Sequence, residues 1–70
     1  MAITQLNPDT FTQVTVSAPS VAQGKSGQVR FAKSASPADG DWIVLSAGDT
    51  IGVTSNFYAS GVGQICVLAV

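Results

Sequence analysis

Apolar and polar residues alternate with a period of two along short segments of this chain, and no long segment has the spacing of an amphipathic helix. Residues 11–18 are the clearest case, because Val14, Val16 and Ala18 share one face while hydroxyl side chains occupy the other. Residues that favour helices are scarce, since glutamate is absent and leucine occurs three times. The chain is therefore expected to fold as β-strands.

Turn-forming residues divide the chain into six or seven short strands. The expected strands cover residues 3–6, 11–18, 28–33, 41–47, 50–54, 56–60 and 64–70. Residues 21–27 and 34–40 are rich in glycine or serine and are expected as long surface loops. This spacing predicts one all-β domain over residues 1–70, a small antiparallel β-sandwich or barrel that is jelly-roll-like.

Two of the expected strands are unusually apolar. Residues 41–47 are apolar on both faces, because Trp42 and Val44 alternate with Ile43 and Leu45. Such a strand is expected at the centre of a sheet or covered on both faces. The uncharged C-terminal strand is expected either at the centre of its sheet or in a contact between subunits, because exposed edges are usually protected by charge or proline.

The aspartates are interpreted as turn residues. Asp39, Asp41 and Asp49 could offer oxygen ligands to calcium, but the twelve-residue calcium loop with its terminal glutamate is absent. We expect Asp39 and Gly40 to form a tight turn, and Asp49 to cap a hairpin through hydrogen bonds to nearby amides. Gly52 is a candidate β-bulge in the returning strand.

Composition excludes several classes of function. The chain has no histidine and one cysteine, so it lacks an imidazole base, an ordinary zinc site and an intrachain disulfide. An enzyme is not expected, and neither is a cofactor or a metal. The net charge is −1 with 10% charged residues, which disfavours nucleic acid and an anionic membrane as partners. The N-terminal residues do not resemble a signal peptide, so synthesis in a cytoplasm is expected.

Small size points to partner subunits. A domain of 70 residues buries only about 60% of the surface of its unfolded chain, and this one has no disulfide or metal to compensate. Association with other chains is the remaining source of stability. The candidates for an intersubunit contact are Ile3, Leu6, Phe11, Leu68, Ala69 and Val70.

The aromatic residues offer a second candidate surface. Trp42 and Tyr58 could form a platform for sugar rings, with Asp41 and Asn56 as polar partners. The alternative is that the large aromatic side chains fill the core, with Tyr58 the most exposed because it lies on the opposite face from Phe57.

Residues 39–53 resemble a hairpin found in small jelly-roll and sandwich modules, in which an apolar strand reaches a Leu-x-x-Gly-Asp turn and returns with x-Val. The resemblance depends on Leu45, Gly48, Asp49, Ile51 and Val53. Similar hairpins occur in tumour-necrosis-factor-like jelly rolls and in short structural proteins of tailed bacteriophages, including capsid decoration (cement) proteins and fibre or knob modules. The composition, with few charges and much Ala, Ser, Thr, Val and Gly, is also similar to that of phage virion proteins. The resemblance implies a structural role in a virion and transfers no functional residues.

We therefore expect a virion structural protein, and above all a capsid decoration protein that binds the assembled shell and stabilises contacts between subunits. Its expected partners are copies of itself, with a trimer favoured, and the major capsid protein or other virion proteins. A tail or fibre module is an alternative, although no segment resembles a coiled-coil or β-helical stalk. A small carbohydrate-binding module for attachment to a host, with a glycan as ligand, is a further alternative.

Overall fold

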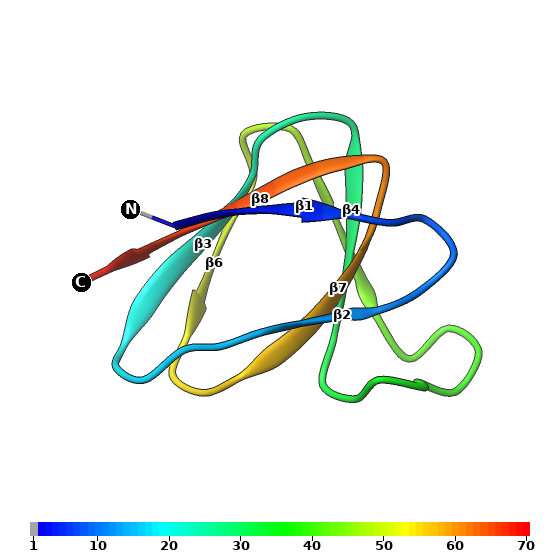
Figure 1. The fold of residues 1–70 in the computed structure, drawn as a ribbon, viewed down its shortest axis with the longest axis horizontal. Helices are drawn as coiled ribbons and strands as arrows, with labels where there is room; N and C mark the ends of the chain where they lie inside the picture. The colour runs from blue at the N-terminus through cyan, green and yellow to red at the C-terminus, as the bar shows by residue number, and fades with distance from the viewer. Residues whose placement is uncertain (1) are drawn as a thin grey trace.

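Eight strands make up the fold of residues 2–70, which are the residues described by this computed structural model (Figure 1). In chain order they are β1 (Ala2–Leu6), β2 (Thr12–Val14), β3 (Ser20–Gly24), β4 (Gln28–Ala32), β5 (Ile43–Ser46), β6 (Thr50–Val53), β7 (Phe57–Gly61) and β8 (Gly63–Ala69). No helix long and apolar enough to cross a membrane occurs in this part of the chain.

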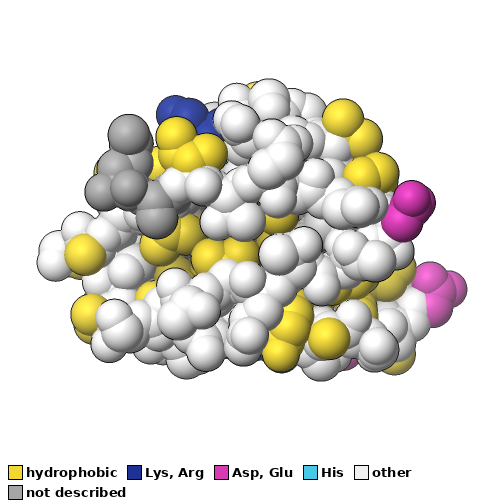
Figure 2. Space-filling view, viewed as in Figure 1, with side chains coloured by type: hydrophobic (Ala, Val, Ile, Leu, Met, Phe, Trp, Pro, Cys, Tyr) yellow, Lys and Arg dark blue, Asp and Glu magenta, His cyan; other side chains and the backbone are white. Residues whose placement is uncertain are grey.

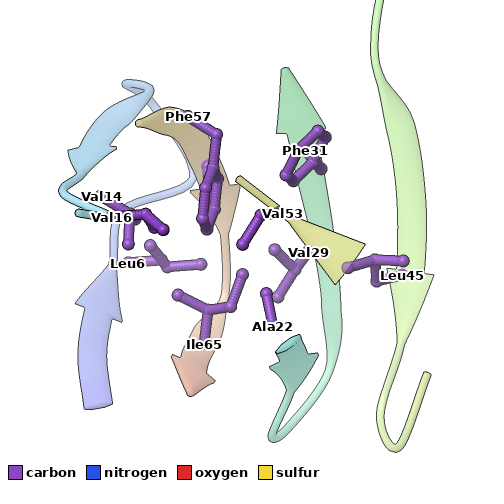
Figure 3. Packing of buried hydrophobic residues seen from close by; sticks show 11 residues of the cluster. Leu6, Val14, Val16, Ala22, Val29, Phe31, Leu45, Val53, Phe57 and Ile65 are labelled. Carbon is purple, nitrogen blue, oxygen red and sulfur yellow. The ribbon is translucent and has the colours of Figure 1, made fainter. Parts of the chain in front are cut away.

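The strands form two four-stranded antiparallel sheets. Sheet A has the order β1-β8-β3-β6, and sheet B has the order β2-β7-β4-β5. The two sheets enclose a common core in a sandwich-like arrangement (Figure 3). The expected all-β antiparallel fold is confirmed, but the number of strands is eight, and the prediction of six or seven is wrong.

Strand β3 is the strand that the sequence pattern missed, because residues 21–27 were expected as a loop. Its inward positions hold only small residues, namely Ser20, Ala22 and Gly24, while Val21 points outward. Space is tight at Gly24, since a Cβ added there would lie 3.3 Å from the carbonyl oxygen of Ser46. A strand whose inward residues are this small does not show the usual apolar alternation.

Strand β5 lies at the edge of sheet B, and its residues Ile43 and Val44 are exposed, so the prediction that it is central or covered on both faces is wrong. It pairs with β4 over Ile43 to Ser46, and of its apolar residues only Leu45 is buried. The turn after it was expected to close a hairpin with β6, but β5 and β6 are edge strands of different sheets, and an exposed turn carries the chain from one sheet to the other. Asp49 caps this turn as expected, because its Oδ2 accepts a hydrogen bond from the amide of Ser46 at 3.0 Å.

Two further expectations concern sheet A. The C-terminal strand β8 lies inside the sheet, between β1 and β3, which is one of the two expected positions. Gly52 forms no bulge, because it pairs with Val21 in an unbroken register that runs from Ser20 opposite Val53 to Gln23 opposite Thr50.

The core is a single layer of apolar side chains that both sheets contribute (Figure 3). Its members are Leu6, Val14, Val16, Ala22, Val29, Phe31, Leu45, Val53, Phe57, Ala59 and Ile65. Phe31 and Phe57 stack with ring centroids 4.7 Å apart, and Phe57 is completely buried. Burying an aromatic side chain of this size supplies much of the stability of a small domain.

A glycine corner connects the two sheets at Gly61, Val62 and Gly63, where β7 of sheet B passes directly into β8 of sheet A. Gly61 has a φ of 141° and Gly63 a φ of 131°. A Cβ at Gly61 would overlap the carbonyl oxygen of Gln28. The corner therefore requires glycine for both its backbone angles and its close approach to β4.

We predict that Gly61→Ala lowers the free energy of unfolding by at least about 2 kcal/mol, because the substitution adds backbone strain and a steric overlap. Gly52→Ala is the matched control. A Cβ at Gly52 meets nothing within 4 Å, so its effect is expected to stay within about 1 kcal/mol. Urea unfolding followed by circular dichroism measures both. Equal stability of the two variants would contradict the role given to the corner.

Candidate functional site

The outer face of sheet A carries exposed aliphatic side chains, and the four strands that form it contain no charged residue. We define the sheet A face as the outward residues Ile3, Gln5, Val21, Gln23, Thr50, Gly52, Gln64, Cys66 and Leu68, which alternate with the core residues of the same strands. None of these strand residues is charged, and Lys25 follows directly after β3, where its amide donates to the carbonyl of Gln64 at 2.9 Å, so a single cation lies at the end of the face. In the view of Figure 2, the visible charged side chains lie along the outline of the molecule.

Three aliphatic side chains and a thiol form the centre of the sheet A face. Val21 pairs with Leu68, and Ile3 pairs with Cys66, so the register places these residues on neighbouring strands. Ile3, Val21 and Leu68 are 50%, 39% and 49% exposed, while Cys66 is buried. The result is an apolar area on a rigid, hydrogen-bonded surface.

The glutamines of the sheet A face are partly occupied with the chain's own groups. Gln64 Nε2 donates to Gln5 Oε1 at 3.2 Å, and Gln5 Nε2 donates to the carbonyl of Gly63 at 3.0 Å. Gln23 Nε2 donates to the carbonyl of Gly48 at 3.2 Å. These bonds reduce the desolvation cost of covering the face, because the amide groups already have partners.

The structure separates the residues that were expected at an intersubunit contact. Ile3 and Leu68 lie on the sheet A face, and Ala69 and Val70 are exposed beside it at the C-terminal end. Leu6 is unavailable for such a contact, because its side chain is 6% exposed and belongs to the core. Residues three apart on a strand face opposite sides, so Ile3 and Leu6 could not have shared a surface. Val21 was missed because residues 21–27 were expected as a loop.

Phe11 belongs instead to an aromatic cluster beside sheet B. Its ring lies 6.1 Å from that of Trp42, with 47° between the planes. The guanidinium of Arg30 lies 5.4 Å from the Phe11 ring and 5.6 Å from the Trp42 ring, within the range of a cation–π interaction. Arg30 Nη2 also donates to the carbonyl of Pro8 at 2.7 Å, which fastens the segment before β2 to sheet B.

Ser60 is buried on the outer side of β7. It pairs with Arg30, and it points away from the core because its neighbour Ala59 points into it. Thr12 pairs with Ala59 in an antiparallel register, so Phe11, the residue before Thr12, lies beside Ser60, the residue after Ala59. The aromatic cluster therefore lies over this part of β7. Ser60 is 0% exposed, and its hydroxyl has no hydrogen-bond partner among residues 2–70.

A hollow of about 320 Å³ opens between the end of β4 and the start of β5. It is lined by Phe31, Ala32, Lys33, Gly40, Asp41, Trp42 and Ile43. Trp42 and Asp41 of the expected sugar platform are thus brought together here. Tyr58 is half-buried on β7 and does not line the hollow. Asn56 is engaged elsewhere, because its Oδ1 accepts a hydrogen bond from the amide of Val16 at 2.7 Å.

The acidic residues do not gather in the described part of the chain. No group of three or more Cys or Asp side chains in residues 2–70 is placed to hold a metal ion. Gly40 has a φ of 81°, and the amide of Asp41 donates to the carbonyl of Ala38 at 2.8 Å, which is the geometry of the expected turn.

Comparison with known proteins gives no match: no protein family, no curated protein and no solved structure is significantly similar to this chain. The two surfaces described above are therefore interpreted from their own chemistry.

We predict that Ser60→Ala raises the free energy of unfolding by about 1 kcal/mol, because it removes a buried hydroxyl without a partner and leaves the backbone unchanged. Ser46→Ala on exposed β5 is the control and is expected to change stability by less than about 0.5 kcal/mol. Chemical denaturation of both variants provides the measurement. A loss of stability in Ser60→Ala would show that the hydroxyl is hydrogen-bonded in solution.

Proposed function

We propose that this protein is a virion structural protein, namely a capsid decoration protein that binds an assembled shell and stabilises contacts between its subunits. The observation that carries the proposal is the sheet A face, where exposed Ile3, Val21 and Leu68 lie on neighbouring strands without a charged residue among them. Clustered apolar side chains at the surface mark interaction sites, and the centres of protein interfaces are depleted of charge.

The rigidity of the sheet A face favours its use as a docking surface. Its central strands β8 and β3 are each hydrogen-bonded on both sides, so the aliphatic side chains are held in fixed positions before any partner arrives. Binding through a preformed surface avoids much of the entropy cost of ordering mobile segments.

The size of the sheet A face indicates what else a contact would include. The face is four strands wide, at about 4.8 Å per strand, and about five residues long, at about 3.3 Å per residue. Its flat area is therefore roughly 300 Å². A stable interface buries about 800 Å² on each partner. The remaining area is proposed to come from the open edge of β1 and from Ala69 and Val70, which adjoin the face. Val70 is 91% exposed and extends this apolar surface.

The strand order supports the same proposal at the level of the fold. We interpret the sheets β1-β8-β3-β6 and β2-β7-β4-β5 as an eight-stranded jelly roll. Viral capsid proteins and lectins are among the proteins built on this architecture. Because one fold carries many functions, the fold alone does not determine the role, and the proposed role depends on the sheet A face.

Self-association is the first expected consequence, with a trimer as the favoured state. The proposed partners are copies of this chain and the major capsid protein of the particle, which places the protein on the virion after synthesis in the host cytoplasm. A role in a tail or fibre would use the same surface. Decoration is preferred because no segment of the chain resembles a stalk.

We predict that the double variant Val21→Thr, Leu68→Thr sediments as a folded monomer, whereas the unmodified protein sediments as a trimer. Each substitution is expected to weaken association about tenfold, because it replaces apolar contact area with a hydroxyl that must be desolvated. Sedimentation velocity, with circular dichroism to confirm folding, is the measurement.

Val44→Thr is the matched control, since Val44 is an exposed valine on β5 of the other sheet, and it should leave association unchanged. Co-sedimentation with particles assembled from the capsid protein encoded nearest to this gene tests docking directly. A folded monomer that neither self-associates nor binds such particles would overturn the proposed function.

A further inference from the structure

We infer that the hollow beside Trp42 is a binding site for a neutral saccharide, with one sugar ring seated between the end of β4 and the start of β5. The observation behind this inference is that one depression is lined by an aromatic, an acidic and a basic residue, namely Trp42, Asp41 and Lys33. The inference does not rest on the proposed role in a virion.

The dimensions of the hollow suit a small ligand. Its volume of about 320 Å³ is at the lower end of the range of about 300–1,000 Å³ that is typical of small-molecule sites. The floor includes the buried residues Phe31 and Ala32, while Lys33 and Asp41 are exposed. An apolar floor beside exposed polar groups suits a ring that is apolar on its C–H faces and polar at its edge.

The indole of Trp42 is held in place before a ligand binds. The centroid of the Phe11 ring lies 6.1 Å from that of the indole, and the guanidinium carbon of Arg30 lies 5.6 Å from the indole centroid. Arg30 is itself fixed by its 2.7 Å hydrogen bond to the carbonyl of Pro8. A ring that is already ordered loses little conformational entropy when a sugar stacks on it, which favours binding.

The charges around the hollow favour a ligand that is neutral and rich in hydroxyl groups. One cation and one anion, Lys33 and Asp41, line the hollow, so their charges balance. A hydroxyl can donate to the carboxylate and accept from the ammonium, and hydrogen bonds to charged groups are the stronger ones. A phosphorylated or nucleotide ligand is disfavoured, because Asp41 would repel it and the net charge of the chain is −1.

The hollow is remote from the sheet A face. Its loop, the green segment around residues 33–42, lies at the lower right of Figure 1, whereas both ends of the chain lie at the left. A molecule attached through the sheet A face and the chain ends would therefore leave the hollow accessible to a second ligand.

The test uses the intact protein and the intrinsic fluorescence of Trp42, which is the chain's single tryptophan. The probes are the methyl glycosides of glucose, galactose and mannose, together with N-acetylglucosamine, each titrated to millimolar concentrations. We expect a saturable change in emission with at least one of them. Amide chemical-shift changes with the same sugar are expected to centre on residues 31–33 and 40–43.

Asp41→Asn should raise the Kd for that sugar about tenfold, because it removes a charged acceptor. Asp39→Asn is the matched control in the same loop. Asp39 does not line the hollow, so the Kd should stay within about twofold.

Four outcomes would overturn the inference, and the last of them concerns uridine. The first is the absence of any saturable response to the four sugars. The second is an equal loss of affinity in the Asp39→Asn and Asp41→Asn variants, and the third is a set of chemical-shift changes centred outside the hollow. Uridine serves as a probe for the rival class of ligand, and binding of uridine in preference to every sugar would reassign the site to a nucleoside.

Discussion

The fold depends on a chain that changes sheets at nearly every step. Following the strands in order, β1, β3, β6 and β8 belong to sheet A and β2, β4, β5 and β7 to sheet B, so only the β4–β5 connection stays within one sheet. No sheet can therefore be completed without the other. The single layer of core side chains holds the two sheets together, because either sheet alone would expose its own core residues to water.

The sequence pattern predicted strands well where apolar and polar residues alternate, and poorly where strand pairing decides the outcome. Residues 28–33 alternate clearly, and β4 forms there with Val29 and Phe31 buried. Strand β3 was not predicted, because its inward residues Ser20, Ala22 and Gly24 are too small to give an apolar alternation. The turn at Asp49 was predicted correctly. The same Gly-Asp turn can join two strands of one hairpin or two strands of different sheets, so the sequence did not determine which strand pairs with β6.

The candidate sites were predictable in part for a similar reason. The sequence pattern made Leu68 a candidate for an intersubunit contact and Trp42 a candidate for a sugar platform, but the residues that surround them are set by long-range strand pairing. Val21 joins Leu68 only through the β3–β8 pairing, and the cluster around Trp42 requires Arg30 from β4 and Phe11 from the segment before β2. Strand pairing places these side chains side by side, and no single stretch of sequence contains that information.

Pairing of β1 with β8 has a consequence for the order of folding. Strand β1 is bonded to β8, with Ile3 opposite Cys66 and Gln5 opposite Gln64, and β1 has no other partner in the described fold. This pairing closes almost the whole described chain into one loop, and contacts between residues so far apart in the sequence carry a large entropy cost of loop closure. Because β1 can join sheet A only once β8 is in place, its docking is expected to be a late step in folding.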